Sequence, residues 1–334
     1  MPEALRPVSI EAVEAARSRL AGVAMRTPLV RLGLPGDAPQ ILLKLESLQP
    51  IGSFKLRGAA NAMALADRAG LAQGVYTASA GNMAQGVAWA ARELGVRCRV
   101  IVPDSAPDTK VAAIERLGGE VIEVPFDAWW QTMQEHRYPG LDGLFIHPFA
   151  DPGVMAGNGT IGLEILEDAP DVGAIVVPFG GGGLSCGIAA AVAATRPDVR
   201  VFAAEVETAA PLSVSLARGA AASVTPIPSF VDGIGGTSVS DEMWPLAQEL
   251  LSGSIVVSLE AVASAIRLLV ERNRVVAEGA GAAPVAAALT GAIDAGTIVC
   301  VVSGGNIDTA TLATILRGEI PQRGAAPAPA PKEH

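Results

Sequence analysis

Four consecutive glycines, Gly180 to Gly183, lie between two apolar runs and limit how this part of the chain can fold. The short continuous apolar run 173–177 before them predicts a buried strand, and the alanine-rich run 188–194 after them predicts a helix. A strand-to-helix turn needs one or two glycines, whereas four let backbone N–H groups converge on an anion at the helix N-terminus. We therefore predict a phosphate-binding turn here, with a purely structural tight turn as the alternative.

Two further segments have the same order of strand, turn and helix. The apolar run 298–302 ends in Ser303 and two glycines, and a helix is predicted over 309–316. A strand is predicted at 74–77 and a helix from about residue 83 to 94. Ligands of open α/β sheets bind at the carboxyl ends of strands, so both turns lie where a ligand would bind. Taken singly, Ser303 could equally cap its turn and Asn82 could be a plain helix N-cap.

Alternation of strand and helix continues along the chain and predicts an α/β protein with parallel sheets and right-handed crossovers. The clearest predicted strands are residues 100–102, 120–124, 174–177 and 201–204, and the clearest helices are 10–21, 109–117 and 259–271.

Lys55 is the most informative single residue. It follows Phe54 and a turn signal at residues 49–52, and it precedes a helix-compatible run at 59–65. This context suits a partly desolvated ammonium group, whose pKa falls so that the free amine becomes available. A free amine can form a Schiff base with a carbonyl cofactor. For a lysine taken alone, a solvated position at a helix start is the alternative.

These segments, in this order, resemble the fold-type II pyridoxal-phosphate (PLP) enzymes, and among them the threonine/serine dehydratase and serine racemase group. The resemblance covers residues from about 10 to 317 and includes the segments 26–29, 43–46, 147–149 and 159–164. It implies a tryptophan synthase β-like fold of two open parallel-sheet domains with the cofactor in the interdomain cleft. It also implies a catabolic-type dehydratase without a regulatory domain.

The resemblance also implies a role for each matching residue. Lys55 would carry the cofactor as a Schiff base and then act as the base at the substrate Cα. Phe54 would pack on the pyridine ring, Asn82 would bind its 3′-oxygen, and Ser303 would bind its nitrogen. The phosphate would be held by backbone N–H groups of Gly180, Gly181, Gly182, Gly183 and Leu184. The substrate carboxylate would be held by the turn Ser79, Ala80, Gly81, Asn82 and Met83.

A serine hydroxyl beside the ring nitrogen does not hold it protonated, so the ring is a weaker electron sink and β-elimination is favoured over transamination. The expected function is a PLP-dependent dehydratase that converts a β-hydroxy amino acid, such as L-threonine or L-serine, to a 2-oxo acid and ammonia. The alternatives are a bulkier substrate (phenylserine, hydroxyaspartate or hydroxyectoine-derived), a serine or aspartate racemase, a β-replacement enzyme, and a non-enzymatic binding protein. Ala80 stands where racemases of this group have a serine, which argues against racemisation.

Other positions also depart from the family pattern. Met83 stands where many relatives have His, and it predicts either simple packing or a preference for a bulkier β-substituent. Candidate residues near the mouth of the pocket are Met83, Phe149, Asn158 and the turn 232–236, whereas Trp129 and Trp130 are expected in the core or an interface. Many relatives bind a divalent cation. The candidate ligands here are Glu205 and the carbonyl of Ala209, but Pro211 replaces an aspartate, so metal binding stays uncertain.

Composition limits the partners. A net charge of −10 argues against nucleic acid as a partner. The sequence has no uncharged apolar segment of 18 residues with the character of a membrane span. The scattered Cys98, Cys186 and Cys300 predict reduced thiols and a cytoplasmic protein. The expected partner is a small amino-acid substrate, and the resemblance suggests a homodimer or homotetramer.

The predicted domain division follows from the same resemblance. Residues 1–73 and 143–320 would form a large PLP-binding domain, and residues 74–142 a small mobile domain. Tyr138-Pro139-Gly140 supports a boundary near residue 142. The Ala/Pro-rich residues 321–334 are predicted to be a disordered tail.

Overall fold

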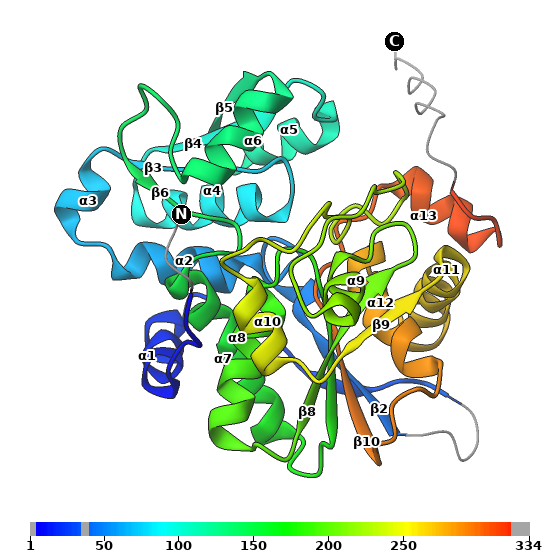
Figure 1. Ribbon diagram of the computed structural model, residues 1–334. Coiled ribbons are helices and arrows are strands. Elements are labelled where there is room, and N and C mark those ends of the chain that lie inside the picture. Colours follow the sequence, from blue (N-terminus) through cyan, green and yellow to red (C-terminus); the bar gives the residue numbers. More distant parts are fainter. Residues whose placement is uncertain (1–4, 35–39, 322–334) are drawn as a thin grey trace.

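The computed structural model describes residues 5–34 and 40–321 (Figure 1). Apart from residue 321, the predicted disordered tail lies outside the described residues. The chain forms two separate sheets, as the resemblance implies. In Figure 1 the four-stranded sheet lies above and to the left of the six-stranded sheet.

The larger sheet has the strand order β1-β2-β10-β7-β8-β9. Its strands are β1 (Leu29–Arg31), β2 (Gln40–Leu45), β7 (Ala174–Pro178), β8 (Arg200–Val206), β9 (Ser254–Val257) and β10 (Thr297–Val302). Only the edge strand β1 runs antiparallel to its neighbour, and the remaining pairs are parallel. Parallel strands place their carboxyl ends at one edge, so the turns after β7 and β10 meet there.

The smaller sheet is fully parallel, with the order β5-β4-β3-β6. Its strands are β3 (Val75–Ala78), β4 (Cys98–Pro103), β5 (Gly119–Val124) and β6 (Leu144–Phe145). All of it is inserted between β2 and β7 of the larger sheet. Strand β6 pairs with β3 although it follows residue 142. The sheet therefore extends past the predicted end of the small domain.

Thirteen α-helices cover the two sheets in the described residues. They are α1 (Ile10–Leu20), α2 (Lys55–Leu65), α3 (Arg68–Ala72), α4 (Asn82–Leu94), α5 (Asp108–Arg116), α6 (Phe126–Glu135), α7 (Pro152–Asp168), α8 (Gly183–Thr195), α9 (Pro211–Arg218), α10 (Trp244–Leu250), α11 (Leu259–Leu268), α12 (Gly279–Leu289) and α13 (Thr309–Leu316). Short helical segments are η1 (Glu46–Leu48) and the π-helix η2 (Leu269–Asn273).

Strand β10 shows why both faces of the large sheet are buried. Val299 and Val301 belong to the core that the helices α1, α7, α8 and α10 cover. Ile298, Cys300 and Val302 belong to the core beneath α11, α12 and α13. Neighbouring residues of a strand point to opposite faces, so a continuous apolar run is what a sheet covered on both sides requires.

The predicted strands are confirmed, and the helices differ at their starts. Helix α2 begins at Lys55 itself, four residues before the predicted run. Helix α8 begins at Gly183, so the last glycine of the run already belongs to its first turn. The predicted helix 259–271 is α11 followed by the π-helical turn η2. The N-cap of α4 is Gly81 rather than Asn82, so the Asn82 side chain is not used as a plain cap.

Helix α7 lies between α2 and α8, and glycines form both contacts. A Cβ at Gly58 of α2 would lie 2.8 Å from Val154, and a Cβ at Gly159 would lie 2.8 Å from the carbonyl oxygen of Gly187 in α8. A side chain at either position would displace backbone or packed side chains. The sequence of small residues in α7 therefore lets three helices approach one another closely.

A buried network of ion pairs connects β2, η1, α2 and α7. Arg57 binds Glu46 at 2.8 Å and Glu164 at 2.6 Å, and Lys44 binds Glu164 at 2.6 Å. All four side chains are almost fully buried. Arg57 and Thr27 also donate hydrogen bonds to Glu46. Although burial alone would raise it, these partners hold the pKa of Glu46 below its ordinary value.

None of the helices formed by residues 5–34 and 40–321 has the length and apolar character that crossing a membrane requires.

Candidate active site

A cavity of about 380 Å³ lies between the two sheets, where the turns after β3, β7 and β10 meet. Its lining contains every residue that the sequence predicts for cofactor or substrate binding: Phe54, Lys55, Ser79, Ala80, Gly81, Asn82, Met83, Gly180, Gly181, Gly182, Gly183, Leu184 and Ser303. Segments that are far apart in the sequence thus contribute to a single site.

Lys55 reaches this cavity because the loop before α2 pairs with the end of β10. Phe54 N donates to the carbonyl oxygen of Ser303 at 2.9 Å, and Gly305 N donates to that of Gly52 at 2.9 Å. Gly52 takes a positive φ of 70°, and a Cβ there would lie 2.5 Å from Oδ1 of Asn306. The turn signal before Lys55 therefore brings the lysine and Ser303 to the same cavity.

The amine of Lys55 is held away from open solvent. Its Nζ donates to the carbonyl oxygen of Pro148 at 2.6 Å and lies 5.2 Å from the centre of the Phe54 ring. Burial lowers the pKa of Lys55 to about 8, although the charge of Glu278 opposes the change. A solvated lysine at a helix start, the alternative interpretation, does not describe this position. The free amine therefore becomes available at a lower pH than in an ordinary lysine.

The four glycines after β7 each have a packing reason as well. Gly182 has a positive φ of 89°, and a Cβ on Gly183 would lie 2.6 Å from the carbonyl oxygen of Phe149. Because the first N–H groups of a helix have no intrahelical partner, those at the start of α8 remain available to an anion. The turn fits a phosphate, and its glycines also make room for Phe149.

Asn158 lies behind this turn rather than at the cavity mouth, where the sequence placed it. It is buried on α7, and its Nδ2 donates to the carbonyl oxygen of Gly183 at 3.2 Å. A position derived from the family pattern does not reveal which face of a buried helix a side chain occupies. The other predicted mouth residues, Met83, Phe149 and the turn 232–236, do line the cavity.

The turn 79–83 joins β3 to α4 and connects the two sheets through Asn82. Its Nδ2 donates to Oε1 of Glu278 at 2.8 Å, and its Oδ1 accepts from Nδ2 of Asn306 at 2.7 Å. These two bonds fix the orientation of the Asn82 amide. One N–H of Nδ2 remains for a ligand, which is compatible with the oxygen contact that the resemblance implies.

Glu278 is a cavity residue that sequence reasoning missed. Burial and the nearby charge of Asp232 raise the pKa of Glu278 to about 7, although Asn82, Lys110 and Lys55 act in the opposite direction. Asp232 is itself paired with Lys110 at 2.6 Å across the mouth. A carboxylate before the small residues Gly279, Ala280 and Gly281 resembles an ordinary helix start, so no sequence signal distinguished it.

Trp129 and Met133 of α6 also line the cavity. The sequence assigned Trp129 to the core or an interface; in the structure it packs against the core of the small sheet and also forms part of the cavity wall. Trp130 lines a second, neighbouring cavity of about 340 Å³.

The residues present fit pyridoxal phosphate. The site combines an amine of lowered pKa, an aromatic side chain beside it, a glycine turn at a helix N-terminus and a serine at the end of β10. An aldehyde, a ring and a phosphate are the three groups that such a set can hold.

Glu205, by contrast, does not fit a cation site. Its Oε1 accepts from Leu212 N at 2.8 Å, and its Oε2 accepts from Ser213 N at 2.8 Å and Ser254 Oγ at 2.6 Å. Both oxygens thus cap the start of α9, and burial raises the pKa of this carboxyl group. A hard cation needs several free oxygen ligands. With Pro211 in place of an aspartate, Glu205 and Ala209 do not form the predicted set.

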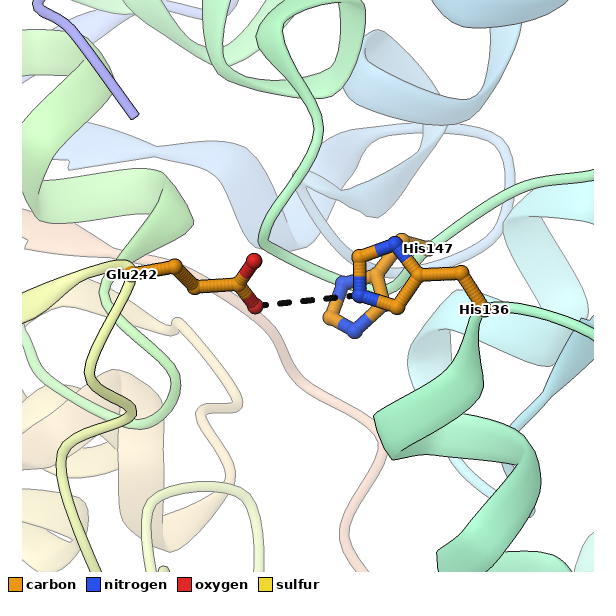
Figure 2. A group of neighbouring side chains, drawn as sticks. All are labelled: His136, His147 and Glu242. Atoms are coloured by element: carbon orange, nitrogen blue, oxygen red, sulfur yellow. Dashed lines mark ion pairs between the residues drawn. The ribbon is translucent and has the colours of Figure 1, made fainter. Parts of the chain in front are cut away.

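A second group of titratable side chains contains His136, His147 and Glu242 (Figure 2). His136 Nε2 lies 3.7 Å from Glu242, while the rings of His136 and His147 stack with centres 4.3 Å apart. His147 Nδ1 accepts from Phe149 N at 3.2 Å and Ala150 N at 2.7 Å. Burial lowers the pKa of His147 to about 3, with the charges of His136 and Lys55 adding to the effect.

His147 therefore stays neutral, with its proton on Nε2, and does not offer a free nitrogen to a metal. Its two backbone contacts instead shape the segment 147–150. That segment places the Pro148 carbonyl against Lys55 and Phe149 against the glycine turn.

Known proteins with similar sequences and structures agree with this geometry. Residues 21–304 match the family described as "Pyridoxal-phosphate dependent enzyme". The chain is 42% identical over 316 residues to an L-threonine ammonia-lyase of Geobacter sulfurreducens, covering 91% of this chain and 77% of the relative.

Two solved structures match over most of both chains. The T.th. threonine deaminase has a TM-score of 0.82 and 37% identity, covering 90% of this chain and 99% of that one. Maize serine racemase has a TM-score of 0.84 and 30% identity, covering 94% and 98%. The chain therefore belongs to the family of pyridoxal-phosphate-dependent enzymes and has their fold-type II architecture.

Proposed function

We propose that this protein is a dehydratase, or ammonia-lyase, that converts a β-hydroxy amino acid such as L-threonine or L-serine to a 2-oxo acid and ammonia. The observation that carries the proposal is that Lys55, with its lowered pKa, and Ser303 line one cavity with the glycine turn. The names of the Geobacter ammonia-lyase and the T.th. deaminase support it.

The reaction balances without an oxidant or reductant. The Cα–H and Cβ–O bonds break, and the hydroxyl group leaves as water after gaining a proton. Hydrolysis of the C–N bond then consumes one water and releases ammonia. When bound, PLP supplies the aldehyde that takes up the substrate amine and the ring that accepts the electron pair from Cα.

The chain's own residues then bind the substrate and move its protons. Lys55 accepts the Cα proton as its free amine, and the Pro148 carbonyl orients that amine. The N–H groups of the turn 79–83 hold the substrate carboxylate at the start of α4. The Ser303 hydroxyl, which lines the cavity at the end of β10, would bind the ring nitrogen without keeping it protonated, and such a ring favours rapid loss of a β-substituent.

Ala80 favours elimination over racemisation. It lines the cavity within the turn 79–83, and its methyl group carries no exchangeable proton. A racemase needs a second acid to return a proton to the opposite face of Cα. Turnover of D-serine, or formation of D-aspartate, at a rate comparable to that of 2-oxo acid formation would contradict this part of the proposal.

The two sheets would close on the substrate as a large and a small domain. Contacts already cross the cavity: Asn82 to Glu278 and Asn306, and Lys110 to Asp232. These pairs join α4 and α5, beside the small sheet, to loops of the large one. Closure of this kind excludes water from the reacting atoms. Domain boundaries near residues 73 and 142 stay a prediction, tested by limited proteolysis with and without substrate.

We also propose a cytoplasmic homodimer or homotetramer. Cys98, Cys186 and Cys300 are free and buried, which fits a reducing compartment. Light scattering of the holoenzyme would measure its mass.

The test is an absorbance spectrum followed by titration with L-threonine and L-serine while 2-oxo acid is assayed. Wild-type protein should show the cofactor's band near the visible edge, and Lys55→Ala should lose that band and the activity. Lys110→Ala, a second lysine of the same cavity, is the matched control and should keep the band. An active, yellow Lys55→Ala protein would contradict the mechanism.

A further inference from the structure

One wall of the cavity is apolar and comes from two segments. Trp129 and Met133 belong to α6, and Phe149 follows β6. Phe149 packs against the glycine turn at Gly181, and its ring meets that of His147 edge to face with centres 4.5 Å apart. Its amide is held by His147 Nδ1. The wall is thus built on a fixed segment at Phe149 and on a flexible side chain at Met133.

Under the proposed function, on which this inference rests, the other walls of the cavity bind the cofactor or the substrate carboxylate, or carry polar side chains. The glycine turn holds the phosphate, the turn 79–83 holds the carboxylate, and Phe54, Lys55 and Ser303 surround the ring. The remaining polar lining is the pair Lys110–Asp232 at the mouth and Glu278 beside Asn82. The turn 233–236 and Ala280 complete the lining with small residues and Ile234, so the α6 wall with Phe149 is the aromatic surface left for the substituent on the substrate's β-carbon.

A second cavity of about 340 Å³ borders this wall. The two cavities share Met133, Phe149 and Gly181, so a side-chain movement of Met133 would join them. Beyond the wall, the second cavity is lined by Trp130 and His147 and by polar and acidic side chains, among them Asp241 and Glu242. Within the first cavity, an aromatic ring on the β-carbon can pack against Trp129, Met133 and Phe149, whereas a methyl group would leave most of that apolar wall uncovered.

We propose that the preferred substrate is a β-hydroxy amino acid whose β-carbon carries an apolar group larger than methyl, with an aromatic ring as the best fit. The reaction is the same elimination, so 3-phenylserine gives phenylpyruvate and ammonia. Met83, which is buried in the cavity lining, adds a fourth apolar group.

The experiment compares kcat/KM of the holoenzyme for L-serine, L-threonine and L-threo-3-phenylserine. The wild-type value for phenylserine should exceed that for serine by about tenfold or more, the range that a few apolar contacts provide. Met133→Gln keeps the size of the side chain but makes it polar. It should lower the phenylserine-to-serine ratio by about tenfold.

Trp130→Phe is the matched control, because Trp130 lines only the second cavity and is partly exposed. It should change the ratio by less than about twofold, within the small effects typical of such sites. The cofactor band of each variant shows that it is folded and loaded.

The outcomes separate the two proposals. Turnover of serine or threonine at a higher kcat/KM than phenylserine leaves the dehydratase function standing and overturns the inference. A preference for phenylserine that Met133→Gln does not reduce also overturns it, because the wall is then not its origin. No 2-oxo acid from any of the three substrates overturns both.

Discussion

Helix α2 carries two basic residues, Lys55 and Arg57, that the protein buries in opposite ways. Arg57 binds two carboxylates, Glu46 and Glu164, and so belongs to a network of two cations and two anions. Lys55 has no carboxylate within ion-pair distance among the described residues, and it donates only to a backbone carbonyl. Paired charges stay charged when buried, whereas an unpaired amine loses its proton more readily. Two positions along one helix thus separate a reactive amine from a structural cation, on roughly opposite sides of α2.

Arg57→Met should have the largest effect on stability, because it leaves two buried carboxylates without their shared partner. Removal of one partner from a buried ion pair costs about 3–5 kcal/mol. Urea unfolding of the apoprotein measures the loss. Arg97→Met is the control, since the Arg97–Glu120 pair is exposed. An equal shift of both midpoints would mean that the network is not what holds α2.

Lys55→Met should do the opposite and stabilise the apoprotein. The pKa of Lys55 falls from 10.5 to about 8 on folding, so the unfolded chain binds the extra proton and folding is penalised below the unfolded pKa, most strongly below about pH 8. The penalty is on the order of 3 kcal/mol at pH 7 and disappears above the unfolded pKa, near pH 10.5. Unfolding of wild type and variant at pH 7 and pH 10 measures this. A variant less stable than wild type at pH 7 would mean that Lys55, like Arg57, stabilises the fold.

Cofactor capture by the apoprotein should depend on pH through the same group. The neutral amine is the nucleophile, so the rate should rise about tenfold per pH unit below pH 8 and level off above it. Stopped-flow absorbance after mixing with PLP gives the rate. A flat profile between pH 6 and 8 would show that Lys55 is already unprotonated or is not the group that reacts.

Lys110→Ala should have the smallest effect. The Lys110–Asp232 pair is partly exposed at the cavity mouth, and such pairs contribute about 1 kcal/mol or less. We expect a change in unfolding free energy within that limit and a modest rise in KM. The KM effect should weaken at about 0.5 M salt, because salt screens exposed charges. A large loss of kcat at unchanged KM would instead give Lys110 a role in the reaction.

Much of this could be predicted from local sequence. The turns at 180–184 and 303–305 follow neighbouring strands, so the parallel large sheet brings them together. The turn 79–83 follows a strand of the small sheet and lines the same cavity. The surroundings of Glu278, Trp129 and Glu205 could not be predicted in this way. Whether a carboxylate caps a helix, binds a metal or faces a cavity depends on which N–H groups and charges surround it in space. The burial of Asn158 under the glycine turn depends likewise on how α7 packs.

Helix α7 has one more consequence. Both α2, which delivers Lys55, and α8, which begins at the glycine turn, rest on it through glycine contacts that leave no room for side chains. The spacing between the backbone of Lys55 and the phosphate turn is therefore set by close contacts among three helices, and only the Lys55 side chain adjusts the position of the amine. Helix α6 makes none of these contacts. The fold in this way holds the reaction centre on close helix contacts and builds the apolar substrate wall on a separate helix.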